Sequence, residues 1–234
     1  MMYTVGINSD GFGSQYQAFM SGIAYCEYKK YTYIHTPIKI LDPKRDGNVE
    51  EMNHFIGIPE TPLSEEYNNK NIITELYSKL VHESLNPSIY YTDKVVKKIR
   101  DFYYSTEKPE INKVDIAIHI RRGDVSSQTF VDHFTSNEYY KKIIEFMKTK
   151  YPNYTITIFS EGDINDFMDL KDENVFFKLN TCIKETFHSL VKAKVLIMAK
   201  SSFSYTAAIL NENEIYYQDF WHKALNHWNL LTNI

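Results

Sequence analysis

The stretch Ile116-Ala-Ile-His-Ile-Arg-Arg-Gly-Asp124 decides the fold of this chain. Apolar side chains alternate with other side chains along it, which predicts a buried strand over residues 114–121. The alternation places His119 and Arg121 on one face of the strand and Arg122 on the opposite face, where we expect a structural carboxylate. A glycine then permits the sharp turn that ends the strand.

Arginine is rare in this chain. Only four of the 234 residues are arginine, and two of them, Arg121 and Arg122, are adjacent at the end of the predicted strand. A guanidinium is planar and permanently charged, and it can donate to two phosphate oxygens at once. Open α/β sheets bind ligands at the carboxyl ends of their strands. The pair therefore indicates a phosphate site. Two alternatives are a surface arginine pair beside a structural aspartate, and an adhesion protein that displays Arg-Gly-Asp.

Composition excludes several classes of protein. A chain of 234 residues fits one large or two small domains, and a hydrophobic fraction of 43% is enough for a core. The net charge of −4 and the isoelectric point near 6.1 argue against a nucleic-acid-binding protein. No apolar run is long enough to span a bilayer, and we expect a cytoplasmic protein. Two cysteines are too few for a disulfide scaffold or a zinc cluster, so we expect both to be reduced.

Strands and helices alternate in the second half of the chain, which predicts a parallel sheet with crossover helices. The predicted strands are 114–121, 154–160, 175–179, 194–199 and 214–217. The predicted helices are 137–150, 164–170, 183–193 and 203–211.

The first half is less regular. We predict a strand at 3–7, a glycine loop at 10–15, a helix at 16–30, a strand at 31–35 and a short helix at 49–55. Residues 65–104 look mainly helical, with a break at Pro87. The polar stretch 105–113 resembles a connector, so we place the boundary between two lobes, 1–108 and 109–234, within it.

A serine-rich turn forms a second candidate phosphate site. Lys200-Ser-Ser-Phe-Ser204 joins a predicted strand to a predicted helix. Its hydroxyls and free backbone N–H groups lie at the positive end of a helix, where phosphate binds readily. Simple capping of the helix is the alternative, because serine is a preferred cap. The candidate residues are Ser201, Ser202, Phe203 and Ser204.

Two further loops carry weaker signals. In Phe159-Ser-Glu-Gly-Asp163, the carboxylate of Glu161 or Asp163 would be able to accept hydrogen bonds from guanine, although Asp163 also suits a helix N-cap. The pair Gly11-Phe-Gly13 lacks the full dinucleotide-binding fingerprint, because Tyr16 stands where the third glycine belongs.

These motifs, in this order, resemble those of the α-1,2-, α-1,6- and protein-O-fucosyltransferase superfamily. His119-Ile-Arg-Arg-Gly-Asp124 resembles its His-x-Arg-Arg-Gly-Asp motif. Asp10-Gly-Phe-Gly-Ser-Gln15 is similar to its N-terminal Gly-x-Gly-x-Gln loop. The segment from Phe187 to Leu210 is similar to its Ser-Ser-Phe-Ser segment. Together the matches span most of the chain.

The resemblance implies an α/β fold of the GT-B-like kind, with two Rossmann-like lobes. The N-terminal lobe would be reduced, because this chain is shorter than a typical member. It implies an inverting, metal-independent transfer of a sugar, usually fucose, from a GDP-sugar to a hydroxyl of a glycan or glycoconjugate. The donor would bind mainly to residues 109–234 and the acceptor to residues 1–108.

Residue roles follow by motif from the same resemblance. Arg121 would hold the pyrophosphate, and His119 would lie beside the nucleotide. Ser202 and Ser204 would contact phosphate through a hydroxyl or the backbone. The resemblance also makes three residues of the N-terminal loop candidates for substrate binding, namely Gly11, Gly13 and Gln15.

The chain contains no Asp-x-Asp, the usual cation-binding motif of glycosyltransferases. Arginines and a helix end would then neutralise the departing GDP. An inverting transfer also needs a base near the acceptor hydroxyl, and the candidates are Asp124 and Asp132. Asp124 would alternatively be structural. The uncertain base leaves a second hypothesis open, a catalytically silent module that binds a nucleotide-sugar.

Overall fold

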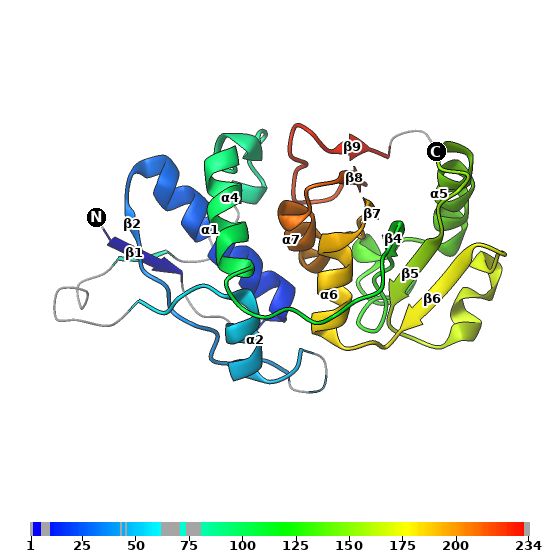
Figure 1. Ribbon diagram of the computed structural model, residues 1–234, viewed down its shortest axis with the longest axis horizontal. Coiled ribbons are helices and arrows are strands. Elements are labelled where there is room, and N and C mark those ends of the chain that lie inside the picture. Colours follow the sequence, from blue (N-terminus) through cyan, green and yellow to red (C-terminus); the bar gives the residue numbers. More distant parts are fainter. Residues whose placement is uncertain are drawn as a thin grey trace. The chain divides into compact units, whose positions relative to one another are not determined.

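The computed structural model describes residues 2–5, 10–42, 44, 46–61, 71–73 and 81–231. The chain forms two compact units (Figure 1). The first, called the N-terminal unit here, is Met1–Lys108 together with Trp221–His227. The second, the C-terminal unit, is Pro109–Phe220 together with Trp228–Ile234. The sequence does not predict that a short segment near the C-terminus returns to the first unit.

A small parallel sheet organises the described part of the N-terminal unit. Its strand order is β2-β1-β3. The elements are β1 (Met2–Val5), α1 (Phe12–Lys29), β2 (Thr32–Tyr33), α2 (Val49–Ile56), β3 (Asn71–Ile73), the 3₁₀ helix η2 (Pro87–Ile89) and α4 (Asp93–Tyr103). Helix α1 packs against β1, β2 and α4. It is almost wholly buried, which explains why apolar residues lie all round it.

The predicted glycine loop at 10–15 is wrong, because most of it is the first turn of α1. The helix begins at Phe12, and the backbone N–H of Phe12 donates to Asp46 Oδ1 at 3.2 Å. The Gln15 side-chain amide donates to the backbone oxygens of Asp10 at 2.6 Å and Ile40 at 2.8 Å. Asp46, which is distant in the sequence, therefore satisfies the first N–H of this helix, and local sequence does not reveal this contact.

The mainly helical prediction for 65–104 is wrong at Asn71–Ile73. These residues form β3, which pairs with β1 in parallel. Two adjacent isoleucines suit a strand, because β-branched side chains pack well on a pleated surface. The helical part is confirmed at α4, and the predicted break falls at Pro87, the first residue of η2. Residues 65–70 and 74–80 lie outside the described residues, as do the last two residues of the predicted strand 3–7.

The C-terminal unit contains a parallel sheet of six strands in the order β6-β5-β4-β7-β8-β9. Its strands are β4 (Ile116–His119), β5 (Ile156–Ser160), β6 (Val175–Leu179), β7 (Val195–Ile197), β8 (Glu214–Tyr217) and β9 (Asn229–Leu230). The predicted strands of the second half are confirmed. Strand β9 is missed, because two exposed residues show no alternation. Two parallel-sheet units, the N-terminal sheet being the smaller among the described residues, confirm the predicted α/β fold of the GT-B-like kind.

Helices cover both faces of this sheet. Helix α5 (Asn137–Lys150) and the 3₁₀ helix η4 (Ile164–Leu170) lie on one face, and α6 (Ile183–Lys192) and α7 (Ser202–Leu210) lie on the other (Figure 1). The main core cluster joins Ile116, Ile118 and Ile120 of the β4 segment to α5 residues such as Ile143 and Met147. The intervening His119 faces α7 instead, as the alternation predicts.

Strand β4 lies at the point where the strand order reverses. The chain leaves β4 toward β5 on one side, and β7 pairs with β4 on the other side. Ligands of doubly wound sheets bind at such a switch point, outside the carboxyl ends of the strands. The motif at 119–124 follows directly from β4 and therefore occupies this position.

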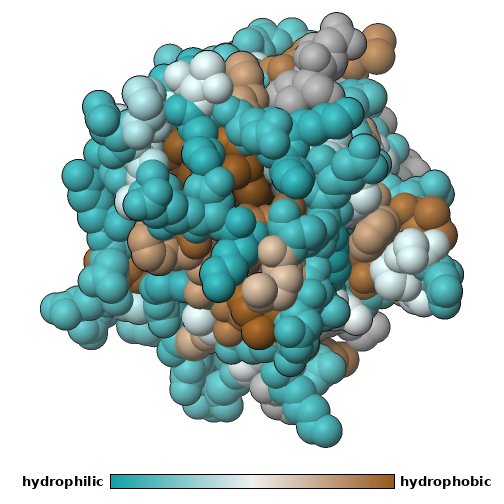
Figure 2. Space-filling view, turned by 90° about the vertical axis from the view of Figure 1, so that its right-hand side faces the viewer, coloured by the Kyte–Doolittle hydropathy of each residue, from teal (hydrophilic) through white to brown (hydrophobic). Residues whose placement is uncertain are grey.

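The face seen in Figure 2 is mostly hydrophilic, with several separate hydrophobic areas. Exposed apolar side chains of the C-terminal unit include Phe130, Phe176 and Leu230. Among the described residues, every helix is too short or too polar to cross a bilayer. The cytoplasmic location stays a prediction. Cys26 is buried, Cys182 is exposed, and neither forms a disulfide.

Candidate functional site

Three loops predicted to carry function meet at one edge of the C-terminal sheet. They follow β4, β5 and β7, which are adjacent strands. Arg121 Nη1 lies 3.4 Å from the backbone oxygen of Lys200, and the rings of His119 and Phe203 lie 5.5 Å apart. A Cβ at Gly123 would lie 2.2 Å from Glu161 Oε2, so the third loop is in contact as well.

The Arg121 guanidinium is held by its own loop. Nε donates to Asp124 Oδ1 at 3.1 Å and Nη2 donates to Asp124 Oδ2 at 2.6 Å, which makes a bidentate pair. Nη1 lies 3.0 Å from His133 Nδ1 and donates to the Lys200 backbone oxygen. The side chain is 24% exposed, so a ligand is able to reach it. Most of its donor capacity is used inside the protein.

Arg122 forms its hydrogen bonds within the protein and contacts the turn before α5. Its guanidinium donates to the backbone oxygens of Arg121 at 2.8 Å and Thr135 at 3.0 Å, and to Asn137 Oδ1 at 2.8 Å. It also lies 4.4 Å from the ring centre of Phe134. Burial lowers its pKa. The sequence predicts a carboxylate partner for Arg122, but none of its described hydrogen bonds goes to a carboxylate. Arg122 therefore organises the turn before α5.

His119 is buried and neutral. Only 9% of the residue is exposed, and Nδ1 has no hydrogen-bond partner among the described residues. Burial, followed by the charge of Arg121, lowers the pKa of His119 to about 3. Buried polar atoms normally have partners, so an orphaned ring nitrogen at a strand end is consistent with a ligand contact.

The serine-rich turn is folded around its own hydroxyls. Ser201 is the N-cap of α7, and its Oγ accepts from the Phe203 N–H at 3.2 Å. The Ser204 hydroxyl is buried and donates to the Ala199 backbone oxygen at 3.2 Å. Ser201 therefore caps helix α7, as expected if the serines cap the helix rather than bind phosphate. A phosphate contact through Ser202 or the backbone N–H groups stays a prediction.

The loop after β5 also shows the capping alternative. Asp163 caps η4, with a reciprocal capping box formed with Asp166. Glu161 is exposed and lies against Gly123 of the motif. Of the two carboxylates proposed for a nucleobase, only Glu161 is seen in contact with the motif.

His133 belongs to the site, although it is not among the candidates predicted from the sequence. It ends the short 3₁₀ helix η3 (Val131–His133), and its Nδ1 faces Arg121. Burial and then Arg121 lower the pKa of His133, so Nδ1 is available as an acceptor. One indication in the sequence that His133 belongs to the site is its position in the loop directly after the motif.

The two candidate bases differ in their surroundings. Asp124 is paired with Arg121 through both oxygens. Asp132 is exposed on η3, beside His133, and its backbone oxygen accepts from Lys200 Nζ at 3.3 Å. Lys200 is a second residue that the sequence analysis leaves out of the site.

The remaining candidates lie in the N-terminal unit. Gly11 is the N-cap of α1, while Gly13 and Gln15 are buried in its first turn. Tyr16, which also follows the glycine pair, is fully buried. Within the described ranges, no group of three or more His, Cys, Asp or Glu side chains is placed to hold a metal ion. Metal independence stays a prediction.

Comparison with known proteins decides the family. Residues 64–220 match the sequence model of glycosyl transferase family 11. The chain belongs to glycosyl transferase family 11. The match confirms the family resemblance inferred from the motifs, and it makes this family 11 member a glycosyltransferase. A search of curated proteins found no match.

Solved structures similar to this family 11 member are distant from it. E. coli heptosyltransferase WaaC with ADP-2-deoxy-2-fluoro heptose shares 9% identity over 98% of this chain and 92% of its own, with a TM-score of 0.45. POFUT1 in complex with GDP-fucose shares 10% identity over 98% and 96%, with a TM-score of 0.48. The iron-containing dodecameric glycosyltransferase TibC from enterotoxigenic E. coli H10407 shares 9% over 97% and 61%, with a TM-score of 0.49. Likenesses this distant do not say what this chain binds.

Proposed function

We propose that this glycosyltransferase moves fucose from GDP-fucose to a hydroxyl of a glycan or glycoconjugate, with inversion and without a metal ion. The observation that carries the proposal is the position of Arg121. It follows β4 at the switch point of the sheet and contacts Lys200, the residue that opens the turn into α7. Family membership and the motif resemblance support GDP-fucose as the donor.

Charge at this edge suits a pyrophosphate. Arg121 and Lys200 are cationic, and the N-terminus of α7 adds a partial positive charge. Such groups stabilise the negative charge that develops on departing GDP, because they are already oriented before the reaction. His119, neutral at physiological pH, would contribute a hydrogen bond without repelling Arg121.

Asp132 is the better candidate for the base. A carboxylate that shares both oxygens with a guanidinium is a weak proton acceptor, and Asp124 is in that state. Asp132 is exposed and lies on the same loop as His133, one residue from a contact of Arg121. We therefore assign proton removal to Asp132 and regard Asp124 as the ion-pair partner of Arg121.

Incubation with GDP-fucose and a panel of glycans tests the proposal, with products detected by mass spectrometry. Transfer to at least one glycan is expected, and chelator should not reduce the rate. Binding of GDP-fucose without transfer to any glycan or to water would favour the silent binding module. Absence of GDP binding by calorimetry would refute both nucleotide readings.

A further inference from the structure

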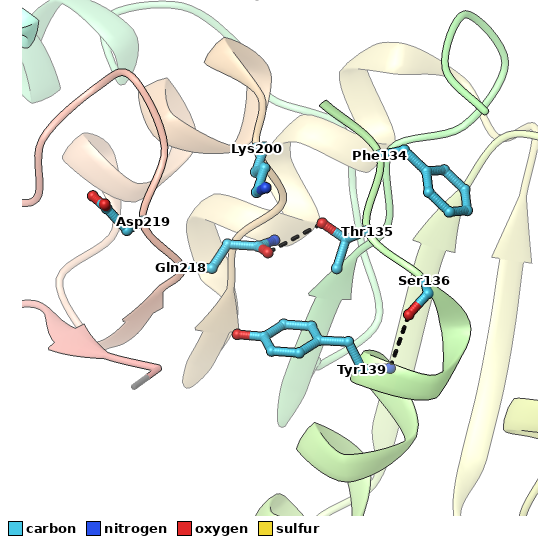
Figure 3. Close-up of a pocket in the computed structure, with 7 residues that line it drawn as sticks. All are labelled: Phe134, Thr135, Ser136, Tyr139, Lys200, Gln218 and Asp219. Atoms are coloured by element: carbon cyan, nitrogen blue, oxygen red, sulfur yellow. Dashed lines mark hydrogen bonds between the residues drawn. The ribbon is translucent and has the colours of Figure 1, made fainter. Parts of the chain in front are cut away.

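A pocket of about 390 Å³ opens beside the motif in the C-terminal unit (Figure 3). We call it the Lys200 pocket. Its lining comes from the turn before α5, the first turn of α5, the loop after β7 and the loop after β8, namely Phe134, Thr135, Ser136, Tyr139, Lys200, Gln218 and Asp219. This volume is near the lower end of the range for ligand pockets, which suits one ring rather than an oligosaccharide.

The central part of the pocket is preformed. Gln218 is 5% exposed, its Nε2 donates to the Met198 backbone oxygen at 3.1 Å, and its Oε1 accepts from the Thr135 hydroxyl at 3.1 Å. Figure 3 shows this last bond, with the ring of Tyr139 beside it. Ser136 accepts from the Tyr139 N–H at 3.3 Å and fixes the start of α5. Walls held in this way bind a ligand with little ordering cost.

Both motif arginines contact the walls of the Lys200 pocket. Arg122 donates to the Thr135 backbone oxygen, and Arg121 donates to the Lys200 backbone oxygen. Lys200 therefore belongs to the pocket and to the cradle proposed for pyrophosphate. A group bonded to a phosphate at Arg121 has this pocket as its neighbour.

The lining chemistry fits a sugar ring better than a nucleobase. Two aromatic rings, Phe134 and Tyr139, are combined with an ammonium, a carboxylate, an amide and the hydroxyls of Thr135, Ser136 and Tyr139. The hydroxyls of a pyranose both donate and accept, so a sugar ring can pair with an ammonium such as that of Lys200 and with a carboxylate such as that of Asp219. A flat base would gain most from stacking, and the Phe134 ring is already covered by the Arg122 guanidinium.

We propose that the Lys200 pocket holds the pyranose ring of the nucleotide-sugar donor, with Asp219 and Lys200 contacting its hydroxyls. The inference rests on the proposed function, because it assumes a donor whose pyrophosphate binds at Arg121. It assigns selection of the donor sugar to residues outside the family motif.

Calorimetry with GDP and with GDP-fucose tests this on three variants. Asp219→Asn keeps the shape of the side chain but removes its charge, and Tyr139→Ala removes the aromatic wall. Both should lower GDP-fucose affinity at least fivefold while GDP affinity stays within twofold. Tyr139→Phe should restore the affinity lost in Tyr139→Ala. Glu145→Gln, an exposed charge change on α5, is the matched control and should change neither affinity.

The outcomes separate this inference from the proposed function. If the wild-type protein fails to bind GDP, the proposed function is wrong and the pocket assignment falls with it. If GDP binds and both variants keep the wild-type ratio of the two affinities, only the pocket assignment is wrong. An unchanged ratio with a raised KM for the glycan would place the acceptor ring there and would also overturn the donor assignment. Asp219→Asn decides alone if Tyr139→Ala does not fold.

Discussion

Arg121 and Asp124 form a bidentate ion pair within a single turn, with Nη2 and Oδ2 only 2.6 Å apart. This pair uses Nε and Nη2, two donors on one edge of the guanidinium that would otherwise bind two phosphate oxygens. The Asp124 carboxylate therefore occupies the place beside Arg121 where a phosphate would bind. A donor pyrophosphate therefore has to compete with Asp124 for these N–H groups.

Replacing Asp124 by Asn tests this competition. The neutral amide competes less well for Arg121 and no longer repels a phosphate, so we expect GDP to bind several-fold more tightly. Calorimetry at low and physiological salt measures the effect. Asp101→Asn, which breaks an exposed pair with Lys97 in the N-terminal unit, serves as the control. Equal or weaker binding of GDP by Asp124→Asn would show that Asp124 orients Arg121 rather than competing for it.

The pKa of His119 makes stability depend on pH. The unfolded chain takes up a proton near pH 6.5, while the folded protein does so only near pH 3, so stability falls as pH decreases between these values. From pH 7.5 to pH 5 this one group should cost about 2 kcal/mol. Hydrogen exchange of the β4 amides measures stability at both pH values. The loss of stability at pH 5 should be smaller in His119→Gln than in the wild type. An identical pH dependence in the two proteins would mean that His119 titrates normally.

Gly123 adopts a backbone conformation that other residues rarely reach, with φ of 81°. Gly123→Ala would add strain there and would press a Cβ toward Glu161. We expect a loss of roughly 1–2 kcal/mol in the unfolding free energy of the C-terminal unit. Urea unfolding measures it, with Ser127→Ala in the same loop as the control. Unchanged stability would show that this turn rearranges freely.

Loss of the base should separate chemistry from binding. Asp132→Asn is expected to lower the transfer rate by roughly 10²–10⁴-fold, which is the usual contribution of general base catalysis. GDP affinity should stay within twofold, because the Asp132 side chain is not among the described contacts of Arg121. Steady-state kinetics together with calorimetry checks both parts. A variant with full turnover would return the assignment to Asp124.

Sequence patterns predicted the C-terminal unit well because its strands are strongly periodic. The alternation around Ile116 and Ile118 fixed both the position of β4 and the face of His119. Serines after a buried strand predicted the start of α7, since capping has a local signature. These features depend on neighbours in the sequence, so one chain is enough to read them.

The features that the sequence did not reveal depend on distant partners. Helix α1 begins early because Asp46, 34 residues away from Phe12, accepts its first N–H. His133 reaches Arg121 through a loop with no periodicity. Arg122 binds backbone oxygens and an amide rather than the expected carboxylate. In each case a tertiary contact decides what a side chain does, and residue type alone does not specify it.

The most direct test is GDP binding by wild-type protein and by Arg121→Lys, measured by calorimetry. A lysine keeps the charge but loses the planar fork, so we predict a loss of roughly 2–3 kcal/mol in binding free energy. Arg100→Lys, in the N-terminal unit, should bind GDP as the wild type does. Equal GDP affinity in Arg121→Lys and wild type would contradict the account, because the guanidinium at the end of β4 would then not hold the pyrophosphate.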